Sequence, residues 1–450
     1  MSQYKPYAVY KDSGVEWLGR VPEHWSVKRL RYTVALNPRV RSDLLEATDL
    51  EVSFLPMEAI GEDGSLDLEL TRLVADVRSG YSYFENGDVV FAKVTPCFEN
   101  GKGALMRELQ SAAGFGSTEL TVLRPNPGVA DAGYINQIVR GSVFRGFGTG
   151  AMTGAGGLKR VPDEFARNFP VSIPGLKEQR AIAANLDREV ARIDALIEKK
   201  STFIELLREK RQALITHAVT KGLDPNAKMK ESGVQWLGEV PGHWTVAPLK
   251  RLISSIGQGW SPECEARVPE DSEWGVVKVG CVNGGVFRSN ESKVLPADMT
   301  PRPELALKAG DVLVSRANTR ELVGSCAVVP RDHPHLMLCD KLYRIGPGEQ
   351  VLPEFLAALI NVHGRRAVEV EATGASSSMV NIAQSVILDL VVAVPDRDEQ
   401  REIIGRVAIA VARIELLRDK TERSIALLKE RRGALITAAV TGQIDLREVA

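Results

Sequence analysis

Residues 174–224 read PGLKEQRAIAANLDREVARID…EKRQALITHAVTKGLD, and residues 395–445 read PDRDEQREIIGRVAIAVARIE…ERRGALITAAVTGQID. The two stretches align without a gap at an offset of 395 − 174 = 221 residues. Self-similarity over such a length decides the architecture of a chain before any single residue does. The sequence therefore predicts a protein built from two related halves.

Each stretch carries the signals of one long helix. Asp396 and Glu399, three residues apart, form a capping-box pattern at the start of the second copy. Gly222 and Gly442 follow the last periodic residues, as is typical of helix C-termini. Both predicted helices begin just after a proline, Pro174 or Pro395.

A seven-residue apolar repeat runs through both helices. A heptad stripe of this kind buries one helix face against another helix. An ordinary helical hairpin core would carry the same stripe, but the repetition of helix, spacing and flanking region favours a coiled-coil spacer formed by the two copies. The polar middle positions favour a role in fixing register, although a lysine can also extend its amine out of a seam. The seam residues are Leu186, Ile193, Lys200, Leu207 and Leu214 in the first helix and Val407, Ile414, Thr421, Leu428 and Leu435 in the second.

The chain ahead of each helix is also written twice. SGVEWLGRVPEHW at 13–25 is repeated as SGVQWLGEVPGHW at 232–244, and the turn and apolar run at 86–91 is repeated at 309–314. The tryptophans of the repeated segments are expected to be packing anchors rather than platforms for stacked bases. The predicted divisions are a first variable domain at 1–174, a first long helix at 175–222, a second variable domain at 223–395, and a second long helix with a C-terminal tail at 396–450.

The composition bounds what such a protein can be. The 57 basic and 58 acidic residues give a formal net charge of −1, so any affinity for nucleic acid must come from local patches or from partners. Five scattered cysteines without a C-x-x-C pair argue against a disulfide framework or a zinc ribbon. The N-terminus has no secretory pattern and no run of 18 or more apolar residues is present, so we expect a soluble protein of the cytoplasm.

On these residues the chain resembles the specificity subunit of Type I restriction-modification systems, over nearly its whole length. The resemblance is carried by the paired W-L-G-x-V-P-x-H-W segments, by the G-D-V turn of each variable region, and by the E-Q-R sequences that open the helices at 178–180 and 399–401. It implies an α+β fold in which two mixed α/β target-recognition domains are joined by two long antiparallel helices. These helices form a coiled coil, and the whole chain is a pseudo-two-fold internal repeat.

The resemblance also implies a division of labour. Each target-recognition domain is expected to read one half of a split site in the major groove of double-stranded DNA, while the helical pair fixes the gap and docks two methyltransferase subunits. Motor-endonuclease subunits are expected to join the complex. The chain itself is expected to be non-catalytic and to bind no cofactor or metal, with S-adenosylmethionine, ATP and Mg used by the other subunits.

Candidate DNA contacts are sought on loops that follow strands, because Arg and Lys pair with guanine and Asn and Gln pair with adenine. Side chains that differ at corresponding places would suit two readers of different half-sites. The loop after 88–91 carries Lys93, Thr95, Asn100 and Lys102, and its counterpart after 311–314 carries Arg316, Asn318, Thr319 and Arg320. A glycine-rich run at 149–157 leads to Lys159 and Arg160, and its counterpart carries Ser377, followed by Asn381 and Gln384. Any one of these is more often an ordinary polar loop residue, so the loops are stronger candidates than their single residues. The glycine-rich run is equally a flexible turn.

No constellation of catalytic residues can be assembled. The sequence has no N-P-P-[FYW] methyltransferase motif and no Walker A motif, and no nuclease carboxylate–lysine set is evident. His333 and His335 lack a third ligand nearby, so a metal site is not expected. Two alternatives remain open: a duplicated coiled-coil scaffold that binds proteins without sequence-specific DNA binding, and a cryptic nuclease that cuts DNA with a divalent metal. The scaffold predicts no salt-sensitive binding to DNA.

Overall fold

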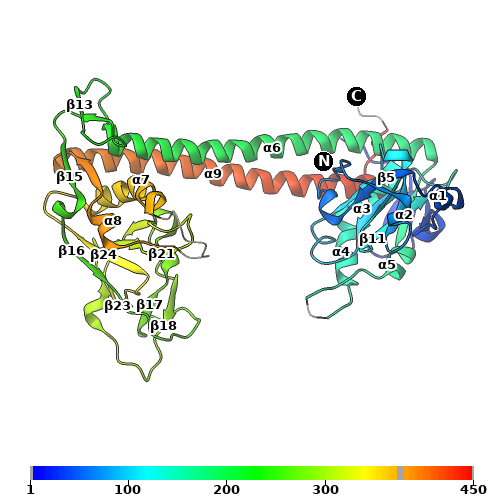
Figure 1. Cartoon of the computed structure of the whole chain (residues 1–450). Coiled ribbons are helices and arrows are strands. Elements are labelled where there is room, and N and C mark those ends of the chain that lie inside the picture. The colour runs from blue at the N-terminus through cyan, green and yellow to red at the C-terminus, as the bar shows by residue number, and fades with distance from the viewer. Residues whose placement is uncertain (1–3, 156, 372–379, 448–450) are drawn as a thin grey trace. The chain divides into compact units, whose positions relative to one another are not determined.

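The computed structural model describes residues 4–155, 157–371 and 380–447. The chain divides into two compact units, unit 1 (Met1–Thr202 with Thr421–Ala450) and unit 2 (Phe203–Lys420). Both divisions fall inside a long helix, so each unit contains one mixed α/β domain and a part of both helices (Figure 1).

Two four-stranded sheets form the domain of unit 1. One has the strand order β4-β11-β8-β9 and is antiparallel, and the other has the order β6-β5-β10-β7, with β5 and β10 parallel. The hairpin β1-β2 and the pair β3-β12 lie outside these sheets. The strands are β1 (Tyr10–Asp12), β2 (Arg20–Pro22), β3 (Ser26–Arg29), β4 (Val34–Leu36), β5 (Glu51–Leu55), β6 (Thr71–Leu73), β7 (Ser82–Glu85), β8 (Val89–Ala92), β9 (Gly103–Leu105), β10 (Ala113–Gly116), β11 (Leu120–Pro125) and β12 (Pro170–Ile173). The helices are α1 (Ser42–Glu46), α2 (Val74–Val77), α3 (Ala132–Arg140), α4 (Ser142–Gly150) and α5 (Asp163–Asn168).

The domain of unit 2 has the same plan. Its two four-stranded sheets have the orders β16-β24-β20-β22 and β18-β17-β23-β19, and β17 and β23 are again the parallel pair. The hairpin β13-β14, the pair β15-β26 and the pair β21-β25 complete it. The strands are β13 (Met229–Glu231), β14 (Glu239–Pro241), β15 (Thr245–Pro248), β16 (Ile253–Gln258), β17 (Gly275–Val277), β18 (Ser292–Val294), β19 (Ala306–Leu307), β20 (Val312–Ser315), β21 (Ala317–Asn318), β22 (Cys326–Val328), β23 (His333–Met337), β24 (Leu342–Pro347), β25 (Val380–Asn381) and β26 (Val391–Val394). The helices are α7 (Pro353–Glu371) and α8 (Gln384–Leu388).

The shared strand order confirms the α+β class and the internal repeat predicted from the sequence. In each unit the apolar run after the G-D-V turn is a central strand, β8 or β20, and all four of its residues are buried. Continuous apolar runs of this kind are typical of strands covered on both faces.

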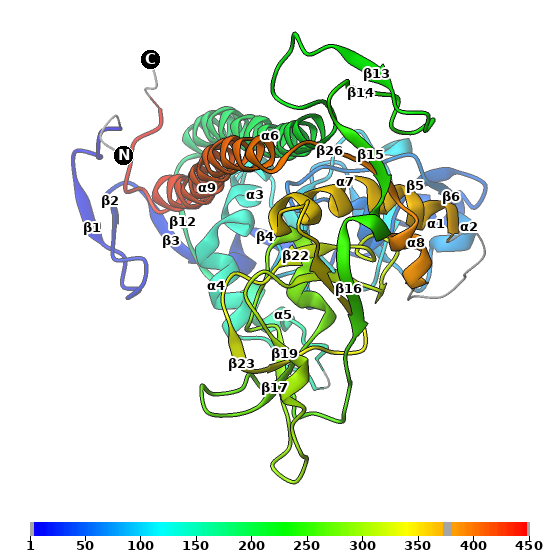
Figure 2. The same cartoon turned by 90° about the vertical axis from the view of Figure 1, so that its left-hand side faces the viewer.

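The repeated helical stretches form α6 (Leu176–Lys221), with 46 residues, and α9 (Arg397–Val440), with 44 residues. In unit 1, Asp194 in the first half of α6 pairs with Arg432 toward the end of α9, with 2.6 Å between Oδ1 and Nη1. In unit 2, Arg211 near the end of α6 pairs with Glu415 of α9 at 3.3 Å. Within each unit the helices therefore run antiparallel, side by side (Figures 1 and 2).

The seam positions lie between the helices or at their edge, and none of the ten is exposed. Thr421 is only 8% exposed and Lys200 is half-buried, so the polar middle positions sit in the same row as the apolar ones. The buried positions are Leu186, Ile193, Leu207, Ile414, Thr421 and Leu435, and the half-buried ones are Lys200, Leu214, Val407 and Leu428.

The glutamate of each E-Q-R sequence bonds to the H-W end of the repeated tryptophan segment. In unit 1, Trp25 Nε1 donates to Glu178 Oε1 at 3.2 Å, and His24 Nε2 lies 2.9 Å from Glu178 Oε2. Trp25 is 0% exposed, and its counterpart Trp244 in unit 2 is likewise 0% exposed and donates to Glu399 at 3.1 Å. These two tryptophans are packing anchors whose single polar atom is satisfied by the start of the long helix.

The glutamine that follows bonds the long helix to the segment that leads into a helix of the domain, α3 in unit 1 and α7 in unit 2. Gln179 is 0% exposed; its Oε1 accepts from Asp131 N at 2.8 Å, and its Nε2 donates to Val129 O and Pro174 O at 3.0 and 2.8 Å. Gln400, also 0% exposed, makes the same three bonds in unit 2. Their partners there are Leu352 N, Gln350 O and Pro395 O, at 2.8, 2.9 and 2.9 Å.

The aspartate of the G-D-V turn fixes an arginine of the neighbouring strand. Asp88 is 1% exposed and accepts from Arg124 Nε and Nη2 at 2.8 and 2.7 Å, and the hydrogen bond to Asp88 raises the pKa of Arg124. In unit 2, Asp311 lies 3.8 Å from Arg344, and burial raises the pKa of its carboxyl. The motif is therefore explained by folding, because a buried charge requires a partner.

We predict that Gln179→Ala destabilises unit 1 by about 2–3 kcal/mol, because it leaves one buried N–H and two buried carbonyls without their partner. Urea unfolding of the full chain measures this change. Arg180→Ala is the matched control, since the neighbouring side chain is 71% exposed and its ion pair to Asp131 is long, at 3.6 Å. Equal unfolding midpoints for the two variants would contradict the role given to Gln179.

Candidate nucleic-acid interface

Two stretches that the sequence singles out separately lie side by side in unit 1. Val94 and Arg160 form an antiparallel bridge, and Thr95 N donates to Lys159 O at 3.0 Å. The Thr95 hydroxyl accepts from Lys159 N at 2.9 Å and donates to Gly157 O at 3.1 Å. The loop after β8 and the end of the glycine-rich run therefore form one surface, which we call the loop junction of unit 1 (residues 93–95 and 157–161).

The corresponding stretches meet in unit 2. Ala317 pairs with Asn381 and Asn318 pairs with Val380 in the two-stranded sheet β21-β25, and Ile382 N donates to Arg316 O at 2.8 Å. The positions are equivalent to those of unit 1, since 317 − 94 = 223 and 381 − 160 = 221. Residues 316–318 and 380–382 form the loop junction of unit 2. The structure thus brings together candidates that are more than sixty residues apart in the chain.

The glycine-rich run is part helix and part loop. Thr149 and Gly150 end α4, whereas Thr153 and Arg160 pair through two main-chain bonds of 3.0 and 2.8 Å and close a loop between them. Gly154 has φ +141°, and a Cβ there would lie 2.4 Å from Leu158 O, so the turn requires glycine.

Some candidate side chains are occupied by the protein itself. Lys102 is half-buried and donates its amine to Met57 O at 2.9 Å. Asn318 is 7% exposed and donates to Asn283 Oδ1 at 3.3 Å. Arg316 is half-buried, donates to Asp340 O at 3.3 Å and lies over the Tyr343 ring, 5.7 Å from its centroid.

Other candidates face solvent. Lys93 and Gln384 are half-buried, and Ser377 lies outside the described residues. Thr95 is half-buried as well. The exposed candidates are Asn100, Lys159, Arg160, Thr319, Arg320 and Asn381.

Two residues at the junctions were missed by the sequence reasoning. Glu119 O accepts from Lys93 N at 2.8 Å in unit 1, and Lys341 O accepts from Arg316 N at 2.9 Å in unit 2. The hydrogen bond from Arg160 lowers the pKa of the Glu119 carboxyl. Each residue directly precedes a strand, β11 or β24, and the two are 341 − 119 = 222 residues apart. No sequence motif marks either of them. The only sequence signal was their equivalent place in the repeat.

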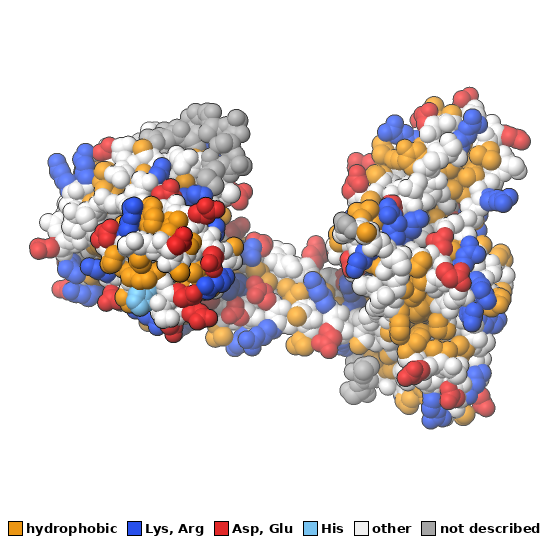
Figure 3. All heavy atoms as spheres, turned by 90° about the horizontal axis from the view of Figure 1, so that it is seen from below, with side chains coloured by type: hydrophobic (Ala, Val, Ile, Leu, Met, Phe, Trp, Pro, Cys, Tyr) orange, Lys and Arg blue, Asp and Glu red, His pale blue; other side chains and the backbone are white. Residues whose placement is uncertain are grey.

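The surface charge is mixed. On the face seen in Figure 3, Lys and Arg side chains lie among Asp, Glu and apolar side chains in both units. This agrees with the balanced composition and leaves local clusters, such as the loop junctions, as the places where phosphate attraction can arise.

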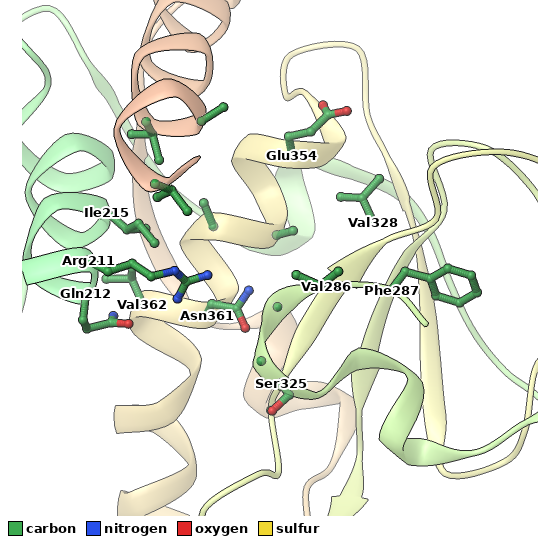
Figure 4. A pocket seen from close by; sticks show the side chains of 18 of the residues that line it. Arg211, Gln212, Ile215, Val286, Phe287, Ser325, Val328, Glu354, Asn361 and Val362 are labelled. Atoms are coloured by element: carbon green, nitrogen blue, oxygen red, sulfur yellow. The ribbon is translucent and has the colours of Figure 1, made fainter. Parts of the chain in front are cut away.

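A cavity of about 600 Å³ lies in unit 2 between α6, α7, α9 and the loops at 284–287 and 321–325 (Figure 4). Its polar side chains are largely engaged within the unit. Asn361 both donates to and accepts from the Cys326 main chain at 2.8 and 2.9 Å, and Arg211 pairs with Glu415. No residue of the loop junction lines this cavity.

His333 and His335 pack against aromatic rings. The ring centroids of His333 and Phe287 are 5.4 Å apart, and those of His335 and Trp274 are 5.2 Å apart. Burial lowers the pKa of His333. Among the described residues no group of three or more His, Cys, Asp or Glu side chains is arranged to hold a metal ion. The helices described here include none with the length and apolar content needed to cross a membrane.

We predict that Thr95→Val loosens the loop junction of unit 1. Valine has nearly the same volume as threonine but lacks the hydroxyl, so the bonds to Lys159 N and Gly157 O are lost. Each lost bond lowers the stability of the loop by about 1 kcal/mol, which speeds hydrogen exchange of the Lys159 amide by about fivefold or more. Hydrogen-exchange mass spectrometry measures this rate, with Thr118→Val, at an exposed threonine nearby, as the control. An unchanged Lys159 rate would show that the hydroxyl does not hold the loop.

The relatives of this chain among curated proteins are specificity subunits of Type I restriction enzymes. The chain is 27% identical over 467 residues to the EcoEI specificity subunit of Escherichia coli, covering 86% of this chain and 77% of that protein. It is 25% identical over 330 residues to the EcoKI specificity subunit of Escherichia coli strain K12, covering 72% and 68%. A match to the Escherichia coli EcoAI specificity subunit is 34% identical over 187 residues, covering 41% and 31%. No family model matches the sequence.

Solved structures share the fold. A chain from a structure of complex assembly and conformational transition of the type I R-M system aligns with a TM-score of 0.72 and 18% identity, covering 93% of this chain and 98% of that chain. The HsdS subunit from Thermoanaerobacter tengcongensis aligns with a TM-score of 0.54 and 19% identity, covering 94% and 98%. With its duplicated domains and repeated helix openings, the chain is similar in sequence to specificity subunits of Type I restriction enzymes, and it shares the fold of the solved structures.

Proposed function

We propose that the domain of each unit reads one half of a split site in double-stranded DNA, in the major groove, and so gives a Type I restriction-modification complex its sequence specificity. The observation that carries the proposal is the loop junction. It is built from the same main-chain pairings in both units, and it presents different side chains. Two domains that recognise different half-sites require a shared main-chain structure that carries different polar side chains.

The differences at the junctions are of the kind that distinguishes bases. Lys93 of unit 1 corresponds to Arg316 of unit 2, and Arg160 corresponds to Asn381. Arginine offers a planar fork that suits guanine, whereas asparagine both donates and accepts and suits adenine. The two domains are therefore expected to recognise different half-sites.

The long helices supply the second part of the function. Each passes from one unit into the other, so the pair is proposed to fix the number of base pairs between the half-sites. Linking two weak readers raises the effective concentration of the second once the first has bound. A net charge of −1 gives the chain little non-specific attraction to DNA, which makes this linkage and the partner subunits the main sources of affinity.

The helices are also proposed to dock two methyltransferase subunits. Leucines at equivalent positions stay outside the seam: Leu206 is 55% exposed and Leu427 is 65% exposed, at an offset of 427 − 206 = 221. Two equivalent apolar positions suit two copies of one partner. In this proposal motor-endonuclease subunits complete the complex, and the chemistry that uses S-adenosylmethionine, ATP and Mg occurs on the partners. The chain itself then performs no catalysis.

We predict that the chain dictates a methylation pattern. Co-expressed with its methyltransferase subunit in a host without adenine methylation, it should produce one two-part motif with a fixed gap, mapped by single-molecule sequencing of the genome. Omitting the chain should abolish the motif. Methylation that is absent in both cultures, or unchanged without the chain, would favour the scaffold function instead.

We predict that Leu206→Glu combined with Leu427→Glu weakens binding of the methyltransferase subunits at least tenfold, because a charge must be desolvated at each docking site. Analytical ultracentrifugation of the purified complex measures the change. Glu198→Ala with Asp419→Ala is the control, since these exposed residues lie at equivalent positions about 80° round each helix from the leucines. Equal assembly of both double variants would place the docking surface elsewhere.

A further inference from the structure

The side chain of Arg160 is held at the loop junction of unit 1 by Glu119. Arg160 Nε donates to Glu119 Oε2 at 2.8 Å and Nη2 donates to Oε1 at 2.6 Å. The main chain of Arg160 is fixed as well, because its N–H and its carbonyl both bond to Thr153. The guanidinium is thus clamped along one edge while its side chain remains 45% exposed.

This clamp leaves the end of the guanidinium free for a ligand. A guanidinium has five N–H donors, and the side-on pair with Glu119 uses one on Nε and one on Nη2. The second Nη2 N–H and one Nη1 N–H form a parallel fork at the end of the group, next to the edge that Glu119 holds. In the major groove, guanine presents O6 and N7 as two adjacent acceptors, which is the arrangement that such a fork matches.

The surroundings favour an anionic or electron-rich partner. Lys93 and Lys159 belong to the same junction as Arg160, and the charge of Lys93 acts on Glu119 together with that of Arg160. The hydrogen bond from Arg160, together with the charges of Arg160 and Lys93, outweighs partial burial and lowers the pKa of Glu119. The carboxylate therefore stays ionised at neutral pH and keeps its hold on the arginine.

Stability alone does not account for the pair. Glu119 and Arg160 are 27% and 45% exposed, and exposed ion pairs contribute little to folding. The junction is already joined by the bridge between Val94 and Arg160 and by the Thr95 bonds. What the carboxylate adds is a single orientation for a long side chain, which removes the entropy that binding would otherwise cost.

Among the described residues of unit 2, no glutamate–arginine pair occupies the positions of this clamp. Lys341 stands where unit 1 has Glu119, and Asn381 stands where it has Arg160. Resting on the proposed function, we infer that Arg160 reads a guanine in the half-site of unit 1, and that Glu119 is the positioning residue that aims it.

The test is methylome mapping of the full complex carrying Arg160→Lys or Glu119→Gln. The wild-type motif should contain a guanine in one half that relaxes in both variants, with discrimination at that one position falling about 5- to 150-fold. The other half-site and the gap should not change. Arg267→Lys is the control, because Arg267 makes a similar bidentate pair with Glu273 in unit 2.

Three results overturn the inference while the proposed function stands. The first is a motif unchanged in both variants, and the second is relaxation in the other half-site. The third is a uniform loss of methylation with the motif intact, which indicates a phosphate contact. A wild-type complex with no chain-dependent motif overturns the proposed function, and this inference with it. Thermal unfolding of each variant identifies one that fails to fold, in which case the other variant decides.

Discussion

Hydrogen bonds at the start of each long helix hold the domain of that unit to the helix. There a glutamate takes the indole N–H of a fully buried tryptophan, and the next residue, a buried glutamine, makes three main-chain bonds to the domain. A buried amide that loses such partners costs more free energy than the bonds contribute when formed. Breaking any one of these hydrogen bonds leaves a buried polar group without a partner. The bonds therefore fix the orientation of each domain on its helix.

This constraint explains which parts of the two halves stay alike and which differ. The E-Q sequences and the tryptophans of the H-W ends recur because the indole N–H and the glutamine amide are buried and need partners. The aspartate of the G-D-V turn recurs beside an arginine of the neighbouring strand. The loop junctions are held by main-chain pairing, which is indifferent to side-chain identity. Side chains there are free to diverge without loss of the frame. A recognition surface of this construction can change the bases it reads at little cost in stability.

The long helices combine two requirements on one sequence. Their seam positions are buried or half-buried and keep the pair in register, and the equivalent ion pairs Asp194–Arg432 and Arg211–Glu415 flank the seam in the two units. Leucines that lie outside the seam contribute nothing to this pairing and leave apolar surface in water. Exposed apolar surface at equivalent positions is compatible with a protein that works inside a larger complex.

The internal repeat and the α+β class could be predicted from the sequence, because self-similarity and local periodicity are visible in the order of the residues. Local start and stop signals likewise predicted the extents of the long helices and the row of seam residues. The sequence also pointed to the two loops of each junction separately. Three findings needed the folded structure: Val94 pairs with Arg160, Glu119 holds the Arg160 side chain, and Lys102 and Asn318 bond to partners inside the protein. These are pairings across strands far apart in the chain, and nothing in local periodicity encodes which distant polar group a side chain will find.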